Sequence, residues 1–270
     1  MGHTRLGSLP KTLKWNALVE QVAGTQLASY GEVPTAALHI DAIAAQTLDA
    51  AQAALSKAAR DPGVRYTFFL LTQVALASRR ANWEGALAHC GIQLSGDSTV
   101  FDLAVEVQSA IDGYVSKRSL GATDVSEMAQ QSAGEALLSL VGKHNVGLFG
   151  GSSSDVKNAV RPLSTKRGFG QLGQRFFGRF VARFLNFYLS RVTAAKLGSP
   201  RLRDLGDIAQ FDAALRAHCE QSALIVRDFC GDWYSKTQYE KRIDLDNSSR
   251  FLAVALRKLR SELEQQGSES

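Results

Sequence analysis

The amino-acid sequence predicts an all-α protein, a multi-helix bundle of about eight helices with a long glycine-rich loop in the middle of the chain. Proline is scarce, with 5 residues among 270, so few positions force a helix to break. Apolar residues recur at spacings of three and four through most of the chain, as they do on one face of a helix. Alanine, the residue with the highest helix propensity, is frequent in residues 34–60.

Breaks and capping residues give the expected limits of the helices in the N-terminal half. Residues 61–63 read Asp-Pro-Gly, which is a strong helix break. Thr99 and Asp102 have the spacing of a capping box at a helix start. The expected helices occupy residues 13–24 or 13–31, 34–60, 64–80, 82–90, 99–121 and 123–141.

Three further helices are expected in the C-terminal half, at residues 172–197, 207–231 and 248–264. The first is closed by Gly198 and Pro200. The second carries side chains at alternating spacings of three and four, which predicts a seam buried against another helix. These side chains are Ile208, Phe211, Leu215, His218, Ser222, Ile225 and Phe229.

The middle of the chain changes in composition. Residues 146–172 are rich in glycine, serine and basic residues, and we expect them to form a loop. This loop divides the chain into an N-terminal helical part, residues 1–145, and a C-terminal helical part, residues 173–270. The sequence leaves open whether the two parts form a single domain.

Basic charge is concentrated in one segment. The whole chain carries a formal net charge of +5. Residues 157–203 contain 11 lysines and arginines and no aspartate or glutamate, whereas the other 223 residues contain 20 basic and 26 acidic residues. Because a field of one sign attracts a partner of the other sign, the segment predicts an anion-binding surface.

Three arginines in this segment lie on one face of the helix predicted at 172–197. Arg175, Arg179 and Arg183 are each one turn apart, and most of the remaining circumference is apolar and rich in phenylalanine. Such a stripe can bind phosphates, acidic lipid headgroups or an acidic protein. Alternatively, the arginines belong to a core helix and pair with acids from elsewhere in the chain.

A glycine pattern precedes this stripe. Gly168, Gly170 and Gly173 match G-x-G-x-x-G and follow Lys166 and Arg167. A dinucleotide fingerprint also needs a preceding strand and a later acid, which are missing here, so we expect an anion-binding or flexible loop. The predicted anion- or partner-binding residues are therefore Lys166, Arg167, Gly168, Gly170, Gly173, Arg175, Arg179 and Arg183.

The sequence shows no complete catalytic or metal-binding constellation. Neighbouring residues on a helix diverge by about 100°, so the adjacent pairs His89-Cys90 and His218-Cys219 are poor nucleophile–base couples. The zinc motifs Cys-x-x-Cys and His-Glu-x-x-His are absent, and we expect no cofactor and no metal. The alternative is an enzyme whose active site lies near His218, Asp232 and Trp233.

Compartment is inferred from the cysteines and the apolar stretches. An odd number of cysteines, 3 in all, without an apolar leader, favours reduced thiols in the cytoplasm. The most hydrophobic stretch, residues 66–77, is about half the length that spans a bilayer, so we expect no transmembrane segment.

Two stretches carry a resemblance to known proteins. Residues 175–191 read RFFGRFVARFLNFYLSR and residues 229–236 read FCGDWYSK. Together they resemble uncharacterised bacterial proteins encoded in anti-phage defence loci, over about the last hundred residues. The resemblance implies a non-catalytic binding or scaffold component of a bacterial multi-protein system, such as antiviral defence. Its expected partner is a co-encoded protein subunit, with nucleic acid or an anionic membrane surface as further candidates.

Overall fold

A computed structural model describes residues 12–24, 40–117, 123–142 and 152–268. Every regular element of secondary structure assigned in these residues is a helix, so the all-α prediction is confirmed. The α-helices are α1 (Leu13–Ala23), α2 (Ile40–Ala50), α3 (Gln52–Ala58), α4 (Pro62–Ala77), α5 (Trp83–Ala88), α6 (Val100–Lys117), α7 (Asp124–Val141), α8 (Ser153–Val160), α9 (Lys166–Ala195), α10 (Leu205–Ser222), α11 (Leu224–Tyr239) and α12 (Leu245–Ser268). A short 3-10 helix, η2 (Arg161–Ser164), joins α8 to α9.

The predicted number of about eight helices is too low because two predicted helices are each divided in two and because α8 lies in the predicted loop. The part of the 34–60 helix that the structure describes is divided at Ala51 into α2 and α3. The 207–231 helix is divided at Ala223 into α10 and α11, and α11 continues through Gly231 to Tyr239. Beyond the break, Val226 and Cys230 are buried and Ile225 is exposed, whereas Phe229 of the predicted seam still packs against the core.

Helix starts that depend on local hydrogen bonds agree with the sequence. The Thr99 backbone N–H donates to the Asp102 carboxylate at 2.7 Å, and the Asp102 backbone N–H donates to the Thr99 hydroxyl at 3.3 Å, which forms the predicted capping box of α6. Asp61 caps α4, with Pro62 in the first turn. These signals are confirmed because they need only residues close in sequence.

The prediction of a loop at 146–172 is wrong for the residues that the structure describes. Residues 146–151 lie outside the described residues, but the chain is helical in α8 and η2, and α9 begins at Lys166. Ser152 and Asp155 form a capping box at the start of α8, and the Thr165 hydroxyl accepts a hydrogen bond from the Gly168 N–H at 3.0 Å. Gly168 and Gly170, two of the glycines that suggested a loop, therefore lie inside a capped helix.

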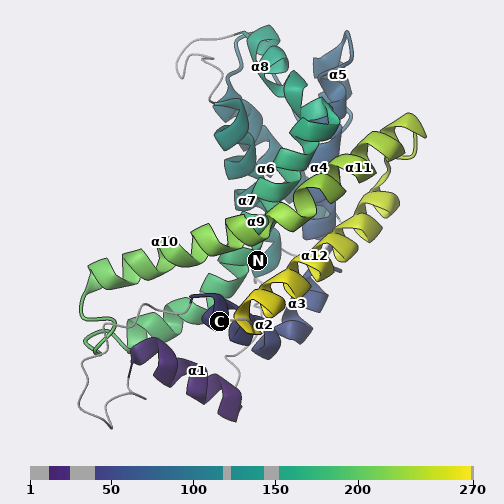
Figure 1. The fold of residues 1–270 in the computed structure, drawn as a ribbon. Helices are drawn as coiled ribbons and strands as arrows, with labels where there is room; N and C mark the ends of the chain where they lie inside the picture. Colours follow the sequence, from purple (N-terminus) through teal and green to yellow (C-terminus); the bar gives the residue numbers. More distant parts are fainter. Residues whose placement is uncertain (1–11, 25–39, 118–122, 143–151, 269–270) are drawn as a thin grey trace.

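Helix α9 occupies the middle of the molecule (Figure 1). It has 30 residues and packs against α7, α10 and α11. Helices α10 and α11 follow one another across α9, and α12 returns alongside α11 to pack against α4 and α2 (Figure 1). Most of α4 to α8 lies on one side of this arrangement, and α1 to α3 lie on the other (Figure 1).

The core is a continuous cluster of buried side chains drawn from both halves of the chain. Its aromatic centre joins four helices, because Phe68 of α4 contacts Phe177 of α9, with ring centroids 5.4 Å apart, and Phe251 of α12 at 5.6 Å. Trp233 of α11 stacks on Phe251 at 4.4 Å. Aromatic pairs of this kind add to the apolar burial that stabilises the fold. The division into residues 1–145 and 173–270 stays a prediction.

Glycines allow α9 and α11 to cross closely. A Cβ added to Gly170 would lie 2.6 Å from the Arg227 carbonyl oxygen, and one added to Gly173 would lie 2.5 Å from the Cys230 sulfur. On the opposite helix, a Cβ on Gly231 would overlap the Lys166 carbonyl oxygen. The G-x-G-x-x-G pattern thus serves close helix packing, and we refer to this contact as the α9–α11 crossing.

Alanine substitutions can measure the crossing. We expect Gly170→Ala to lower the free energy of unfolding by about 1–3 kcal/mol, because the added methyl group would clash with the backbone carbonyl of Arg227. Gly113→Ala in α6 is the control: the added Cβ would point into open space, and the substitution should stabilise the protein by about 0.5–1 kcal/mol through helix propensity. Urea unfolding of both variants is the measurement, and equal effects would contradict the assignment.

Candidate functional site: a basic groove at the α9–α11 crossing

The arginine stripe of α9 is paired with acids from two other helices. Arg175 forms an ion pair with Glu220 of α10 at 2.5 Å. Arg179 lies between two carboxylates, 3.2 Å from Glu220 and 3.6 Å from Glu135 of α7. Arg183 pairs with Glu135. Of the two interpretations of the stripe, the geometry corresponds to internal pairing, which ties α9 to α7 and α10.

Partial burial strengthens these pairs. The side chain of Arg179 is 17% exposed and that of Glu220 is 21% exposed, so solvent screens their attraction less than it would at an open surface. An external anion would have to displace carboxylates that are already in place. The stripe is therefore less available to a ligand than its sequence suggests.

Removing the central arginine should weaken the fold. We expect Arg179→Leu to lower the free energy of unfolding by about 2 kcal/mol, because Glu135 and Glu220 each lose one of the arginines that neutralise them. Arg167→Leu, an exposed position on the same helix, should change it by less than about 0.5 kcal/mol. Denaturant unfolding of the two variants side by side checks this. Similar losses in both would show that the pairing of Arg179 contributes nothing.

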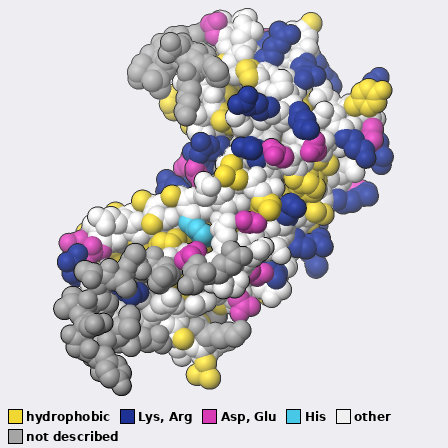
Figure 2. Space-filling model, viewed as in Figure 1, with side chains coloured by type: hydrophobic (Ala, Val, Ile, Leu, Met, Phe, Trp, Pro, Cys, Tyr) yellow, Lys and Arg dark blue, Asp and Glu magenta, His cyan; other side chains and the backbone are white. Residues whose placement is uncertain are grey.

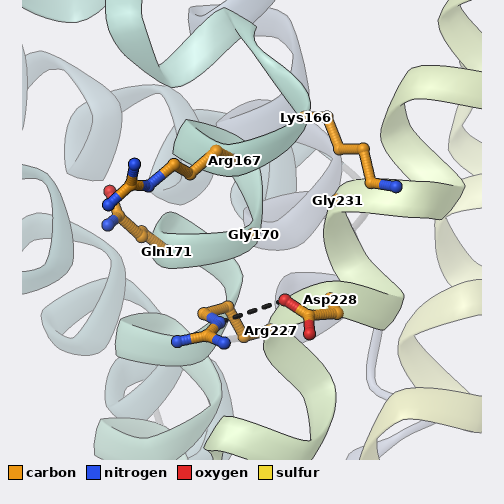
Figure 3. Close-up of a pocket in the computed structure, with 7 residues that line it drawn as sticks. All are labelled: Lys166, Arg167, Gly170, Gln171, Arg227, Asp228 and Gly231. Carbon is orange, nitrogen blue, oxygen red and sulfur yellow. Dashed lines mark hydrogen bonds and ion pairs between the residues drawn. The ribbon is translucent and has the colours of Figure 1, made fainter.

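A groove of about 450 Å³ lies beside the α9–α11 crossing. This volume falls in the usual range of ligand-binding sites. We call it the α9–α11 groove, and it is lined by Lys166, Arg167, Gly170, Gln171, Arg227, Asp228 and Gly231 (Figure 3). The glycines bring the two backbones together, and the longer side chains on either side of them form the walls.

The charges of the groove are not all engaged. Lys166 forms an ion pair with Asp232, and the hydrogen bond and charge of this carboxylate raise the pKa of the lysine, which stays protonated. Arg227 Nε lies 3.1 Å from Asp228 Oδ1. Arg167 is exposed, and it has no ion-pair partner among the residues that the structure describes. The groove therefore offers one guanidinium without a counterion and a second that is only partly neutralised.

Hydrogen-bond donors from both helices face the same side of the groove. Arg167 and Gln171 are one turn apart on α9, and their side chains extend together in Figure 3. Arg227 extends from α11 toward that side, whereas Lys166 points away from Arg167 (Figure 3). Guanidinium groups present planar pairs of N–H donors that match phosphate and carboxylate oxygens. The arrangement suits the binding of an oxyanion.

The structure places the predicted site residues in three different environments. Lys166, Arg167 and Gly170 line the groove. Gly168 and Gly173 face other parts of the protein, since a Cβ on Gly168 would overlap Pro162 and one on Gly173 would meet Cys230. Arg175, Arg179 and Arg183 are paired as described above.

Sequence reasoning missed the α11 side of the groove. Arg227 and Asp228 belong to the helix predicted at 207–231, which was interpreted through its buried seam alone. One signal was present: Arg227 lies four residues before Gly231, on the same helix face as a glycine that permits close packing. The sequence alone does not reveal that this face meets Gly170.

The residues of the alternative active site have different neighbours. Asp232 pairs with Lys166, and Trp233 stacks on Phe251. His218 lies on α10, where burial lowers its pKa and the charge of Asp41 on α2 acts in the opposite direction. His218 Nε2 is buried without a hydrogen-bond partner among the described residues. The structure does not bring the three side chains together.

The two thiols of the C-terminal half are in apolar surroundings. Burial is the main cause that raises the pKa of Cys219 to about 12, and it also raises the pKa of Cys230 strongly. Because the thiolate is the reactive form, neither sulfur is prepared for nucleophilic chemistry at neutral pH.

Comparisons with protein-family models, curated proteins and solved structures found no match for this chain. In the described residues, no helix has the length and apolar character needed to cross a bilayer. The same residues contain no group of three histidine, cysteine or acidic side chains placed to hold a metal ion. The groove is therefore assessed from its own geometry.

The half-buried His218 gives the fold a pH dependence. Because burial lowers the pKa of His218 in the folded state, its protonation favours unfolding, and stability is lost as the pH falls through the ordinary histidine pKa of about 6.5. We expect wild type to lose more unfolding free energy than His218→Gln between about pH 8 and pH 5. His89→Gln, at an exposed position, serves as the control and should follow wild type. Identical pH profiles for all three proteins would contradict this role.

Proposed function

We propose that this protein is a non-catalytic binding component that engages an anionic target through the α9–α11 groove. One observation carries the proposal: the groove gathers Lys166 and Arg167 from α9 and Arg227 from α11, and Arg167 has no acidic partner in the described part of the chain. An anion bound there would take the place of that missing partner without breaking an existing ion pair. Binding of this kind needs no reactive group.

Three observations favour binding over catalysis. His218 is half-buried on α10 beside Asp41, whereas Asp232 pairs with Lys166 and Trp233 stacks on Phe251. The raised pKa values of Cys219 and Cys230 keep both thiols protonated. The groove contains arginine, lysine and glutamine, which orient and neutralise an oxyanion, and its one carboxylate is next to Arg227.

The resemblance to proteins of anti-phage defence loci supports a scaffold role in a bacterial multi-protein system. Residues 175–191 form the part of α9 that pairs with α7 and α10, and residues 229–236 form the part of α11 next to the crossing. Proteins that share these stretches would share the framework of the groove. On this proposal the protein acts in the cytoplasm beside a co-encoded subunit, and its anionic target is a nucleic acid, an acidic protein or a membrane surface.

Retention on a heparin column tests anion binding without assuming the target. We expect Arg167→Glu with Arg227→Glu to elute at clearly lower salt than wild type, because it reverses both guanidinium charges of the groove. The matched control, Lys57→Glu with Lys117→Glu, makes the same change in net charge at exposed positions on α3 and α6. The proposal is wrong if both variants elute at the same salt concentration.

A further inference from the structure

Further basic residues lie on or next to α4, α8 and η2, and η2 contacts α4, α8 and α9; Arg80 and Arg161 are exposed, and Lys157 is half-buried. Arg80 follows α4, Lys157 lies on α8, and Arg161 begins η2. We call these three residues the basic track. Lys and Arg side chains gather on the face shown in Figure 2, over the half that holds α8, the start of α9 and α11.

Hydrogen bonds fix the track next to the groove. Arg79 Nε donates to the Ser164 hydroxyl at 2.9 Å, which attaches the end of α4 to the turn that precedes α9. Lys157 Nζ donates to the Ala81 carbonyl oxygen at 3.2 Å, which holds α8 against the same end of α4. The start of α9, with Lys166 and Arg167, follows within two residues of Ser164. The track and the groove thus share one rigid support.

Two acidic side chains near the track accept hydrogen bonds from serines at the start of α8. Glu84 accepts a hydrogen bond from the Ser153 hydroxyl at the start of α8. Asp155 accepts hydrogen bonds from Ser152, which lower its pKa and use it as a helix cap. From Lys157 to the groove residues of α9 there is no acid in the sequence. The segment from Lys157 to these residues therefore contributes no negative charge of its own, whereas Asp155 beside it stays ionised.

We propose that the groove and the basic track bind a single-stranded nucleic acid, an inference that rests on the proposed function. One phosphodiester lies in the groove between the guanidinium groups of Arg167 and Arg227, with the Gln171 amide as an additional donor. Neighbouring phosphates of the strand lie over Arg161, Lys157 and Arg80. A chain of regularly spaced charges can use both the groove and the track, whereas a single anion uses only the groove.

The shape of the site favours a single strand over a duplex. A duplex accepts a protruding helix or ribbon in its major groove, about 12 Å wide. Here the cations of Arg167 and Arg227 line a hollow between two crossing helices. The ligand must therefore fit into the protein, whereas a duplex would need a protein element that fits into its groove. A flexible strand can bend its backbone into such a hollow.

A membrane surface fits less well. Binding at a bilayer interface requires an apolar band beside the basic residues. The exposed large apolar side chains of the described residues are Leu13, Phe101, Val105, Leu197, Leu205, Ile225, Tyr239 and Val254. Among these, Ile225 alone is within a helical turn of a groove residue in the sequence. Ile225 is therefore the one exposed large apolar side chain of the described residues that is close in sequence to the groove lining.

Fluorescence anisotropy with labelled oligonucleotides tests the inference. The probes are single-stranded RNA and DNA of about 16 nucleotides, the upper end of common site sizes, and a duplex of the same sequence. With five phosphate contacts, we expect the affinity of wild type for the single strands to fall about 100-fold between 50 and 200 mM salt. Arg167→Glu with Arg227→Glu should weaken it at least about tenfold, and Lys57→Glu with Lys117→Glu should change it far less.

The track has its own readout. Arg80→Glu with Arg161→Glu leaves the groove intact, and each lost contact should reduce the slope of log affinity against log salt by about 0.7. Circular dichroism and the thermal midpoint confirm that each variant remains folded. Loss of affinity with an unchanged salt slope would overturn the assignment of phosphates to the track.

Further probes separate this inference from the proposed function. Labelled polyglutamate and vesicles that contain phosphatidylserine are titrated with the same variants. If either probe binds in a groove-dependent manner and the single strands do not, the nucleic-acid inference is overturned and anion binding stands. If no anionic probe binds, both are overturned. Tighter binding of the duplex than of the single strands would also overturn the inference.

Discussion

The close crossing of α9 and α11 is the constraint on which the rest of the structure depends. Gly170 and Gly173 on α9 and Gly231 on α11 remove the side chains that would hold the backbones apart. The approach brings Phe169 onto Tyr234, with ring centroids 4.1 Å apart, and seals the aromatic centre of the core. The same approach leaves a hollow beside the contact, since backbones that touch at one point diverge on either side. Packing and the groove thus have a common origin.

The acid-free segment divides its cations between two uses. Along the middle of α9, Arg175, Arg179 and Arg183 obtain counterions from Glu135 and Glu220, which are far away in the sequence. At the start of the helix, Arg167 has no such counterion among the described residues. A cluster of basic residues in the sequence therefore predicts that anions will bind to it. It does not show whether those anions are acidic side chains of the same protein or a ligand. The fold decides this residue by residue.

Local signals predicted more of this protein than long-range ones. The capping box at Thr99 and the break at residues 61–63 were predictable because their hydrogen bonds join residues within one turn. The glycines at 168–173 were misjudged because glycine favours loops in isolation and close packing in a tertiary contact. Arg227 was missed for the same reason: its role depends on meeting a helix that begins about 60 residues earlier in the chain. Half of the groove follows from sequence, and the other half follows from the crossing.

The glycines of the crossing also indicate how relatives of this protein could be recognised. Any chain that keeps the two helices in contact must keep very small residues at the positions of Gly170, Gly173 and Gly231, whatever it binds. Arg167 and Arg227 are exposed, and the packing of the two helices does not require their guanidinium groups. Drift at the arginines with retention of the glycines would mark homologues that preserve the architecture after losing the ligand, whereas joint retention would mark a lineage in which the ligand still exerts selection.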